Sequence, residues 1–112
     1  MKQVIVTGGR DYNDWATVKS VLDFHQPDVV IQGGAKGADR LARVWAMTKG
    51  IEPITVDAEW TKHGRAAGPI RNREMLDKYP NAFVIAFPGD RGTADCVRAA
   101  TERNRIIFEV YK

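Results

Sequence analysis

Three short glycine-rich segments contain the residue types that bind phosphate groups. They read GGRDYND (8–14), GGAKGAD (33–39) and PGDRGTAD (88–95). Glycine lets the backbone approach a ligand closely, and the helix start that follows each segment offers free amide groups with partial positive charge. The Thr93 hydroxyl would either donate to a phosphate oxygen or cap its helix. One such loop alone is more often a simple turn, so the prediction of a phosphate site depends on all three meeting at one edge of a sheet.

A fourth segment, GRAAGPIRNREM (64–75), places cationic side chains at the start of a helix. Positive charge is unfavourable there because it faces the positive end of the helix dipole. We therefore expect Arg71, with Asn72 beside it, to contact an anion, since arginine binds phosphate through two parallel hydrogen bonds. The alternative is a solvated helix face on which Glu74 pairs with Lys78.

Several other kinds of site are excluded. No GK[ST] sequence follows the glycines, so the segments do not match the P-loop of nucleoside triphosphatases. The glycine spacing in GGAKG differs from the dinucleotide fingerprint of NAD dehydrogenases. The single cysteine, Cys96, excludes an internal disulfide and a multi-cysteine metal site, and His25 and His63 lack ligand spacing. We expect no metal and no cofactor. The net charge of +3 suits an anionic ligand without indicating nucleic acid.

Short apolar runs and stripes of helical period predict the elements that position these segments. Strands are expected at 3–7, 28–32, 52–57, 81–87 and 105–111, and helices at 14–24, 37–49, 69–78 and 92–103. This order predicts one α/β domain, 1–112, with a parallel sheet and helices on both faces. The most apolar strand, 81–87, is expected to be central. The glycine segments then follow the carboxyl ends of strands, where such sheets bind ligands.

The segment 58–68 shows no periodicity and is expected to be a loop at the site. Its Trp60 is a candidate for stacking on a base, with Tyr12 of the first glycine segment as a second candidate. The alternative for Trp60 is packing at the edge of the sheet. His63 would contact phosphate, donate a proton or remain solvated.

Taken together, these segments resemble the SLOG superfamily, and within it the YspA-like branch. The resemblance is carried by TGGRDY, QGGAKGAD, HGRAAGPIRNREM and FPGDRGT in this order. It implies a Rossmann-like three-layer α/β/α fold with a mainly parallel five-stranded sheet that binds nucleotides or nucleotide-derived ligands. The superfamily includes Lonely Guy phosphoribohydrolases and DNA-processing proteins of the DprA type. The resemblance also implies a homo-oligomer.

One position departs from the Lonely Guy pattern PGGxGTxxE. FPGDRGTADC matches its proline, two glycines and threonine, but Asp90 replaces a glycine and Cys96 stands where the catalytic glutamate is expected. Cysteine carries no negative charge unless its pKa is strongly lowered. We expect Cys96 to be a small buried side chain. Asp95 lies about 100° away on the helix.

The leading interpretation is a cytoplasmic protein, not associated with membranes, that binds a nucleotide or nucleotide sugar as a sensor or ligand-binding protein. Its expected contacts are the loop residues and the arginine segment, namely Gly8, Gly9, Arg10, Gly33, Gly34, Lys36, Gly37, Asp39, Arg71, Asn72, Gly89, Arg91, Gly92 and Thr93.

Two alternatives remain open. The first is an N-glycoside hydrolase acting on a nucleoside monophosphate, with Asp95 or Glu74 as the catalytic carboxylate. The second is a DprA-type module for single-stranded DNA, which needs a basic groove with stacking aromatic residues. Its charge would come from Lys36, Arg40, Arg43, Arg98, Arg103 and Arg105.

Overall fold

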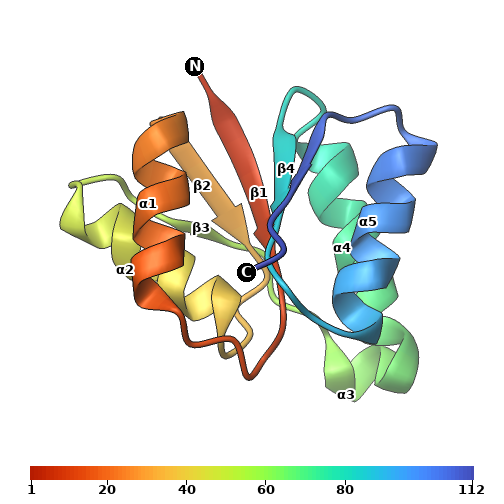
Figure 1. Ribbon diagram of the computed structural model, residues 1–112. Helices are drawn as coiled ribbons and strands as arrows, with labels where there is room; N and C mark the ends of the chain where they lie inside the picture. Colours follow the sequence, from red (N-terminus) through yellow and green to blue (C-terminus); the bar gives the residue numbers. More distant parts are fainter.

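The computed structural model describes residues 1–112 and contains one five-stranded sheet between two layers of helices (Figure 1). All neighbouring strands are parallel, in the order β3-β2-β1-β4-β5. No helix is long and apolar enough to cross a membrane. The strands are β1 (Gln3–Thr7), β2 (Val29–Gln32), β3 (Ile54–Thr55), β4 (Phe83–Ala86) and β5 (Ile107–Glu109); the helices are α1 (Trp15–His25), α2 (Ala38–Thr48), α3 (Trp60–His63), the 3-10 helix η1 (Gly64–Ala66), α4 (Ala67–Lys78) and α5 (Arg91–Glu102). The predicted three-layer α/β fold is confirmed.

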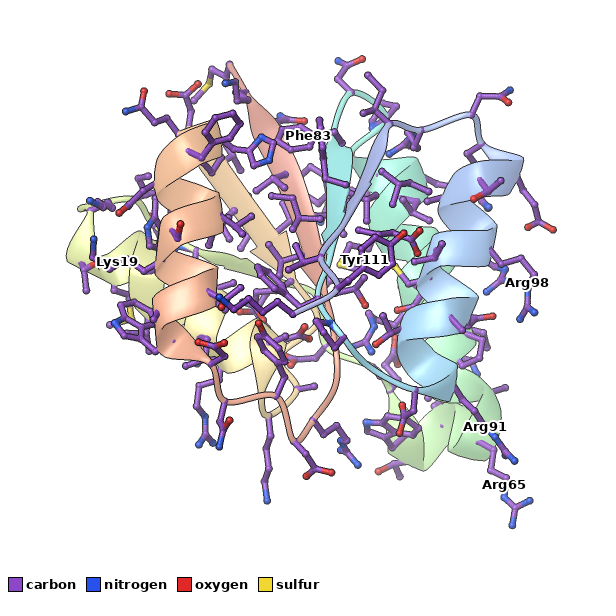
Figure 2. All side chains as sticks on the ribbon, viewed as in Figure 1. Lys19, Arg65, Phe83, Arg91, Arg98 and Tyr111 are labelled. Atoms are coloured by element: carbon purple, nitrogen blue, oxygen red, sulfur yellow. The ribbon has the colours of Figure 1, made fainter.

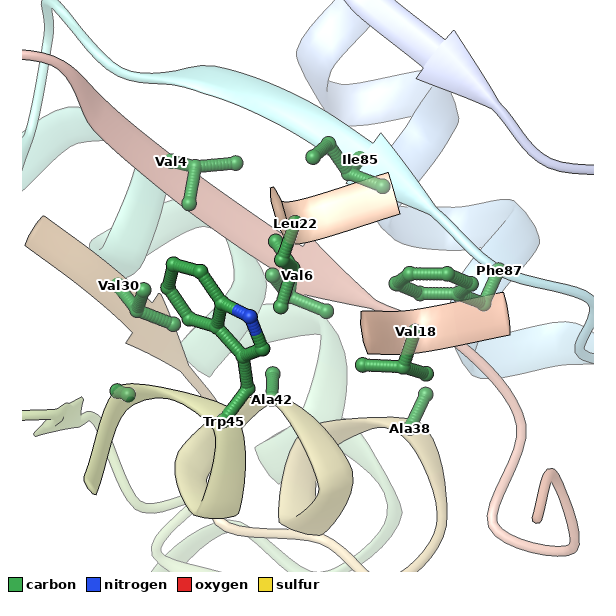
Figure 3. Close-up of a cluster of buried hydrophobic side chains, with 11 residues drawn as sticks. Val4, Val6, Val18, Leu22, Val30, Ala38, Ala42, Trp45, Ile85 and Phe87 are labelled. Carbon is green, nitrogen blue, oxygen red and sulfur yellow. The ribbon is translucent and has the colours of Figure 1, made fainter. Parts of the chain in front are cut away.

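Successive side chains of the central strand point to opposite faces of the sheet, and each face is covered by its own pair of helices. Val6 packs in a buried cluster with Leu22 of α1 and Trp45 of α2 (Figure 3). Its neighbour Ile5 belongs to a second cluster, formed with α4 and α5, that includes Cys96. Each large apolar side chain buried in this way contributes roughly 1.5–3 kcal/mol.

The central strand is β1, so the expectation that 81–87 is central was wrong. β4 has a neighbour on each side and both of its faces are covered, which explains its continuous apolar sequence. Any strand with two neighbours and two covered faces has this apolar sequence, so the sequence does not distinguish the central strand β1 from the interior strand β4. The edge strands are shorter than predicted, because 52–57 pairs only over Ile54–Thr55 and 105–111 only over Ile107–Glu109.

The segment 58–68 is not a simple loop. It forms α3 and η1, and α4 begins at Ala67 rather than at Pro69. Neither α3 nor η1 contains a buried residue, so no hydrophobic period marks them in the sequence. Pro69 is tolerated as the third residue of α4, where an amide would have no partner within the helix.

Backbone contacts join the three glycine-rich segments at the carboxyl edge of the sheet. The Gly9 amide donates to the Pro88 carbonyl at 2.8 Å, and the Ala38 amide donates to the Gly9 carbonyl at 3.2 Å. Gly37 has a φ of 76°, and a Cβ atom there would overlap the Gly9 carbonyl oxygen. A side chain at position 37 would thus both strain the backbone and separate the first two segments.

Arg105 fixes the end of α4 on the same side of the sheet as α5, and its removal is expected to lower stability. Its guanidinium donates to the carbonyls of Tyr79 and Ala82, both at 3.1 Å, and to that of Leu76. Arg105→Met would leave the Leu76 and Ala82 carbonyls without a partner, whereas Tyr79 keeps the Ala82 amide, and it should lower the free energy of unfolding by about 1–3 kcal/mol, as measured by urea denaturation. The exposed Arg43→Met on α2 is the matched control. Equal stability of the two variants would contradict this role.

Candidate functional site

A cleft of about 700 Å³ lies at the carboxyl edge of the sheet, between the ends of β1 and β2, the segment after β3 and the first turns of α4 and α5. It brings together most of the residues that the sequence indicated. Those lining it are Gly8, Arg10, Gly33, Gly34, Asp39, Trp60, Arg71, Asn72, Arg91, Gly92, Thr93 and Asp95. The four segments thus face one common space.

Some predicted contact residues lie outside the cleft lining. Gly9, Gly37 and Gly89 form the backbone junction of the loops instead. Lys36 is exposed and does not line the cleft. Glycine at these junctions is explained by contact between the loops, without any need for a ligand.

Tyr12 and Glu74 also lie away from the cleft. The Tyr12 ring packs on Phe87 with 5.4 Å between ring centroids, and its hydroxyl donates to the Lys112 carbonyl at 2.9 Å. Glu74 is exposed on α4 and lines a shallow surface depression together with Asp77. The structure therefore does not bring either side chain to the residues of the other loops.

Sequence reasoning missed two carboxylates of the cleft, Asp57 and Asp90. Their place in the sequence could have identified them. Asp57 follows β3 by two residues, and Asp90 immediately precedes α5. Figure 2 shows that Arg65 and Arg91 extend from the same end of the molecule, beside α3 and the start of α5. Both arginines line the cleft.

The first turn of α5 offers several unused hydrogen-bond donors. The amides of Arg91, Gly92 and Thr93 donate to no protein acceptor, and the Asp90 side chain does not cap them. The Thr93 hydroxyl is buried without a hydrogen-bond partner, with only 9% of the residue exposed. Thr93 is therefore not the helix cap that the alternative interpretation allowed, and its oxygen lies beside free amides in the wall of the cleft.

Arg71 is held in place from two sides. Its Nη1 donates to the Gly33 carbonyl at 2.6 Å, and its Nε donates to Asn72 Oδ1 at 3.0 Å. A Cβ atom at Gly33 would overlap the guanidinium, so glycine is required for this approach. Arg71 Nη2 donates to no protein group, which leaves a fixed cationic donor in the cleft.

Asp95 is fully engaged with basic and amide side chains. Burial raises its pKa, but hydrogen bonds from Arg73, Asn72 and Arg98 outweigh this effect and hold the pKa below its ordinary value. Oδ1 accepts from Arg73 and Arg98, and Oδ2 accepts from Asn72 and Arg73. Asp95 is thus an ionised carboxylate that joins α4 to α5.

Cys96 is completely buried, as predicted, and burial raises the pKa of its thiol to about 11. At neutral pH the side chain is therefore an uncharged thiol. It packs in the cluster of α4 and α5 with Ile5 and Val84. Position 96 supplies no negative charge to the cleft.

Asp39 is a buried carboxylate in the wall of the cleft, 6% exposed. Its Oδ2 accepts from the Gly33 amide at 3.1 Å and from the Ala35 amide at 3.2 Å, whereas Oδ1 accepts no hydrogen bond. Burial raises the pKa of Asp39 to about 6, although these amides and the nearby charge of Arg71 lower it in part. No salt bridge neutralises it.

Ionised Asp39 is expected to destabilise the folded protein. Its pKa rises from 3.8 in the unfolded chain to about 6, which corresponds to about 3 kcal/mol. Because the folded state binds this proton more tightly, stability falls as pH rises from about 4 to 6, and the full penalty is present above pH 6. Asp39→Asn should therefore raise the free energy of unfolding at pH 7 and remove this slope, as measured by urea denaturation across pH 4–8.

The exposed Asp11→Asn is the matched control, since it removes the same charge outside the cleft. It should change neither the stability at pH 7 nor the slope. A lower stability of Asp39→Asn at every pH would contradict the proposed penalty and show that the ionised carboxylate stabilises the loop.

Comparisons with known proteins show the family and the fold of this chain. The model of the "YspA, cpYpsA-related SLOG family" (YAcAr) matches residues 2–63. The "Gene 61 protein" of Mycobacterium phage D29 is 38% identical, over 89% of this chain and 89% of its own length. The solved structure of TM1055 has a TM-score of 0.71 at 19% identity, covering 96% of this chain and 72% of that one.

DNA processing protein A (DprA) from Streptococcus pneumoniae has a TM-score of 0.78 at 19% identity and covers all of this chain. This chain spans only about half of it, since 51% of DprA is matched. At this identity both solved structures support the fold alone. The family model and the phage relative also show the family: the chain belongs to the YspA, cpYpsA-related SLOG family.

Proposed function

We propose that this protein binds a nucleotide or nucleotide-derived ligand, as a sensor or ligand-binding protein, with a phosphate group at the first turn of α5. The observation that carries the proposal is the Thr93 hydroxyl, which is buried in the cleft wall without a partner. A buried polar group without a hydrogen bond costs about 1–3 kcal/mol. A phosphate oxygen would accept from this hydroxyl and remove the penalty.

The surrounding donors suit phosphate in number and charge. The free amides of Arg91, Gly92 and Thr93 lie in the same helical turn, and Arg71 Nη2 is unused. A helix start favours anions because of its free amides and partial positive charge. Membership of a SLOG family supports a nucleotide-derived ligand as the source of the phosphate.

Trp60 supports an aromatic base in the ligand. Its indole is 54% exposed and lines the cleft, while α3 itself buries no residue. A Cβ atom at Gly68 would lie 3.4 Å from Trp60 Cη2, so the ring rests against the start of α4. An exposed aromatic face in this position would gain contact area by stacking on a base.

Neither carboxylate predicted for hydrolysis is available in the cleft. Both oxygens of Asp95 already accept hydrogen bonds, which leaves no free carboxylate oxygen for a nucleophile or base. Glu74 lies outside the cleft, and the Cys96 thiol is neutral. The N-glycoside hydrolase alternative thus lacks an available carboxylate at both of its predicted positions.

The basic residues of the DNA-binding alternative do not form one groove. Arg40 and Arg43 lie on α2, whereas Arg98 and Arg103 lie on or beside α5 in the opposite helical layer. Arg103 pairs with Asp77. We therefore favour a small ligand over single-stranded DNA.

Self-association remains a proposal. Phe24 and Tyr111 are more than four-fifths exposed, and Phe108 of the edge strand β5 is 44% exposed. Figure 2 shows Tyr111 on the outer side of the molecule, in front of the sheet. Exposed aromatic side chains of this kind are common at protein interfaces.

Thr93→Val tests the phosphate site directly. The variant keeps the shape of the side chain and removes the hydroxyl, so it should lower the affinity for the ligand about 10- to 100-fold, as expected for a lost hydrogen bond to a charged group. The free protein should keep its stability or gain about 1 kcal/mol, because the unpaired hydroxyl is gone. Calorimetric titration with AMP, ADP-ribose and cyclic AMP, together with urea denaturation, measures both.

The matched control is Thr101→Val at the far end of α5, whose hydroxyl donates to the Val97 carbonyl instead. It should leave ligand affinity unchanged. If wild-type protein binds no member of a broad nucleotide panel, the proposed function is wrong.

Gly92 provides a second test with opposite effects on stability and binding. A Cβ atom at this position would meet no protein atom within 4 Å, and its φ is not positive. Gly92→Ala should therefore stabilise the helix by about 0.5–1 kcal/mol. It should also weaken nucleotide binding at least about tenfold, because the added methyl group enters the space next to the free amides.

Ala94→Gly, at an exposed position of the same helix, is the control for this test. It should lower the thermal midpoint and leave affinity unchanged. Wild-type affinity in Gly92→Ala would show that the phosphate does not approach this turn.

A further inference from the structure

The cleft contains a second group that lacks a partner, and it is an acceptor rather than a donor. Asp39 Oδ2 is held by the Gly33 and Ala35 amides, but Oδ1 accepts nothing. The side chain lines the cleft and only 6% of the residue is exposed, so the free Oδ1 keeps its exposure toward the cleft, where a ligand would replace water. A ligand group facing Asp39 Oδ1 must therefore donate a hydrogen bond.

The order of the strands places this acceptor between the two parts of the site already described. The first turn of α5 follows β4, Asp39 contacts the Gly33 amide at the end of β2, and Trp60 lies in the segment after β3. Along the sheet the order is β4, β1, β2 and β3. Neighbouring strands lie about 4.8 Å apart, so the ends of β4 and β2, from which the two segments start, are separated by about 10 Å.

A mononucleotide has the same order of chemical groups. Its phosphate is an acceptor of hydrogen bonds, its sugar carries hydroxyl donors, and its base has an aromatic face. The site offers donors at Thr93, an acceptor at Asp39 and an aromatic ring at Trp60, in that order along the sheet edge. The sugar is therefore the part of the ligand that reaches the carboxylate.

We propose that Asp39 Oδ1 accepts a hydrogen bond from a ribose hydroxyl, so that the cleft selects ribonucleotides over their deoxy analogues. This inference rests on the proposed nucleotide-binding function and specifies the sugar that the ligand must carry. An analogue without the hydroxyl leaves a carboxylate oxygen of the cleft unpaired, and sites of this kind discriminate strongly against such analogues.

The wild-type protein tests the inference by calorimetric titration with AMP and with its 2′-deoxy, 3′-deoxy and 2′,3′-dideoxy analogues. Loss of the contacted hydroxyl should weaken binding about 10- to 100-fold, as expected for a hydrogen bond to a charged group. Inosine monophosphate, which keeps the ribose but lacks the exocyclic amine of adenine, should bind within about threefold of AMP, since Asp39 is not expected to contact the base.

Asp39→Asn provides an independent test, because the asparagine side chain has nearly the same shape as that of aspartate. The amide oxygen can replace Oδ2 as acceptor from the Gly33 and Ala35 amides, which leaves an amide nitrogen, a donor, toward the cleft. The preference for AMP over dideoxy-AMP should fall well below that of wild type, because a neutral amide bonds a hydroxyl more weakly than a carboxylate does. Inorganic pyrophosphate, which has no sugar, should bind the variant at least as well as wild type because a negative charge is removed. Asp11→Asn should keep the full ribose preference.

The outcomes separate the two proposals. Equal affinity of wild type for AMP and dideoxy-AMP would overturn the sugar assignment and leave nucleotide binding in place. A preference that follows the exocyclic amine rather than the hydroxyls would also overturn it. Absence of binding to every nucleotide and to pyrophosphate would overturn the proposed function, and the sugar assignment with it. The deoxy series uses wild-type protein, so a variant that fails to fold does not affect the result.

Discussion

Parallel pairing of β1 with β2 on one side and β4 on the other is the constraint on which the site depends. It directs the carboxyl ends of three strands to the same edge, so the segments that follow must turn there within a few residues. The Gly9 backbone then bonds to both neighbours, to Pro88 through its amide and to Ala38 through its carbonyl. An antiparallel partner on either side would send one of these segments to the other end of the molecule.

The resulting cleft contains polar side-chain atoms that have no hydrogen-bond partner within the protein. The Thr93 hydroxyl has no acceptor and Asp39 Oδ1 has no donor, although both residues are more than nine-tenths buried. Elsewhere the chain pairs its buried polar groups, as Gln32 shows by donating to Thr55 and accepting from the Gly34 amide. The Thr93 hydroxyl is the exception, and its place in the wall of a cleft is better explained by a ligand than by imperfect packing, because buried polar groups in native proteins are generally paired.

The sequence predicted the long helices, whose apolar side chains repeat regularly, and missed two short helical segments that bury nothing. The stripe of α2, which includes Ala42 and Trp45, was visible because burial repeats every three to four residues. α3 and η1 bury nothing, so their residues carry no such period. Tyr12 and Trp60 were equivalent in the sequence as aromatic residues near the site. Only the tertiary structure separates them, since Tyr12 packs on Phe87 while Trp60 lines the cleft.

The charge balance of the cleft argues that recognition depends on directed hydrogen bonds rather than on a general positive field. Four aspartates, at 39, 57, 90 and 95, and four arginines, at 10, 65, 71 and 91, line it, so their formal charges cancel. The net charge of +3 therefore comes from residues outside the cleft. A polyanion attracted by charge alone would find no excess of positive charge in this space. A small ligand that accepts hydrogen bonds at one end and donates them at the other can satisfy both kinds of unpaired group.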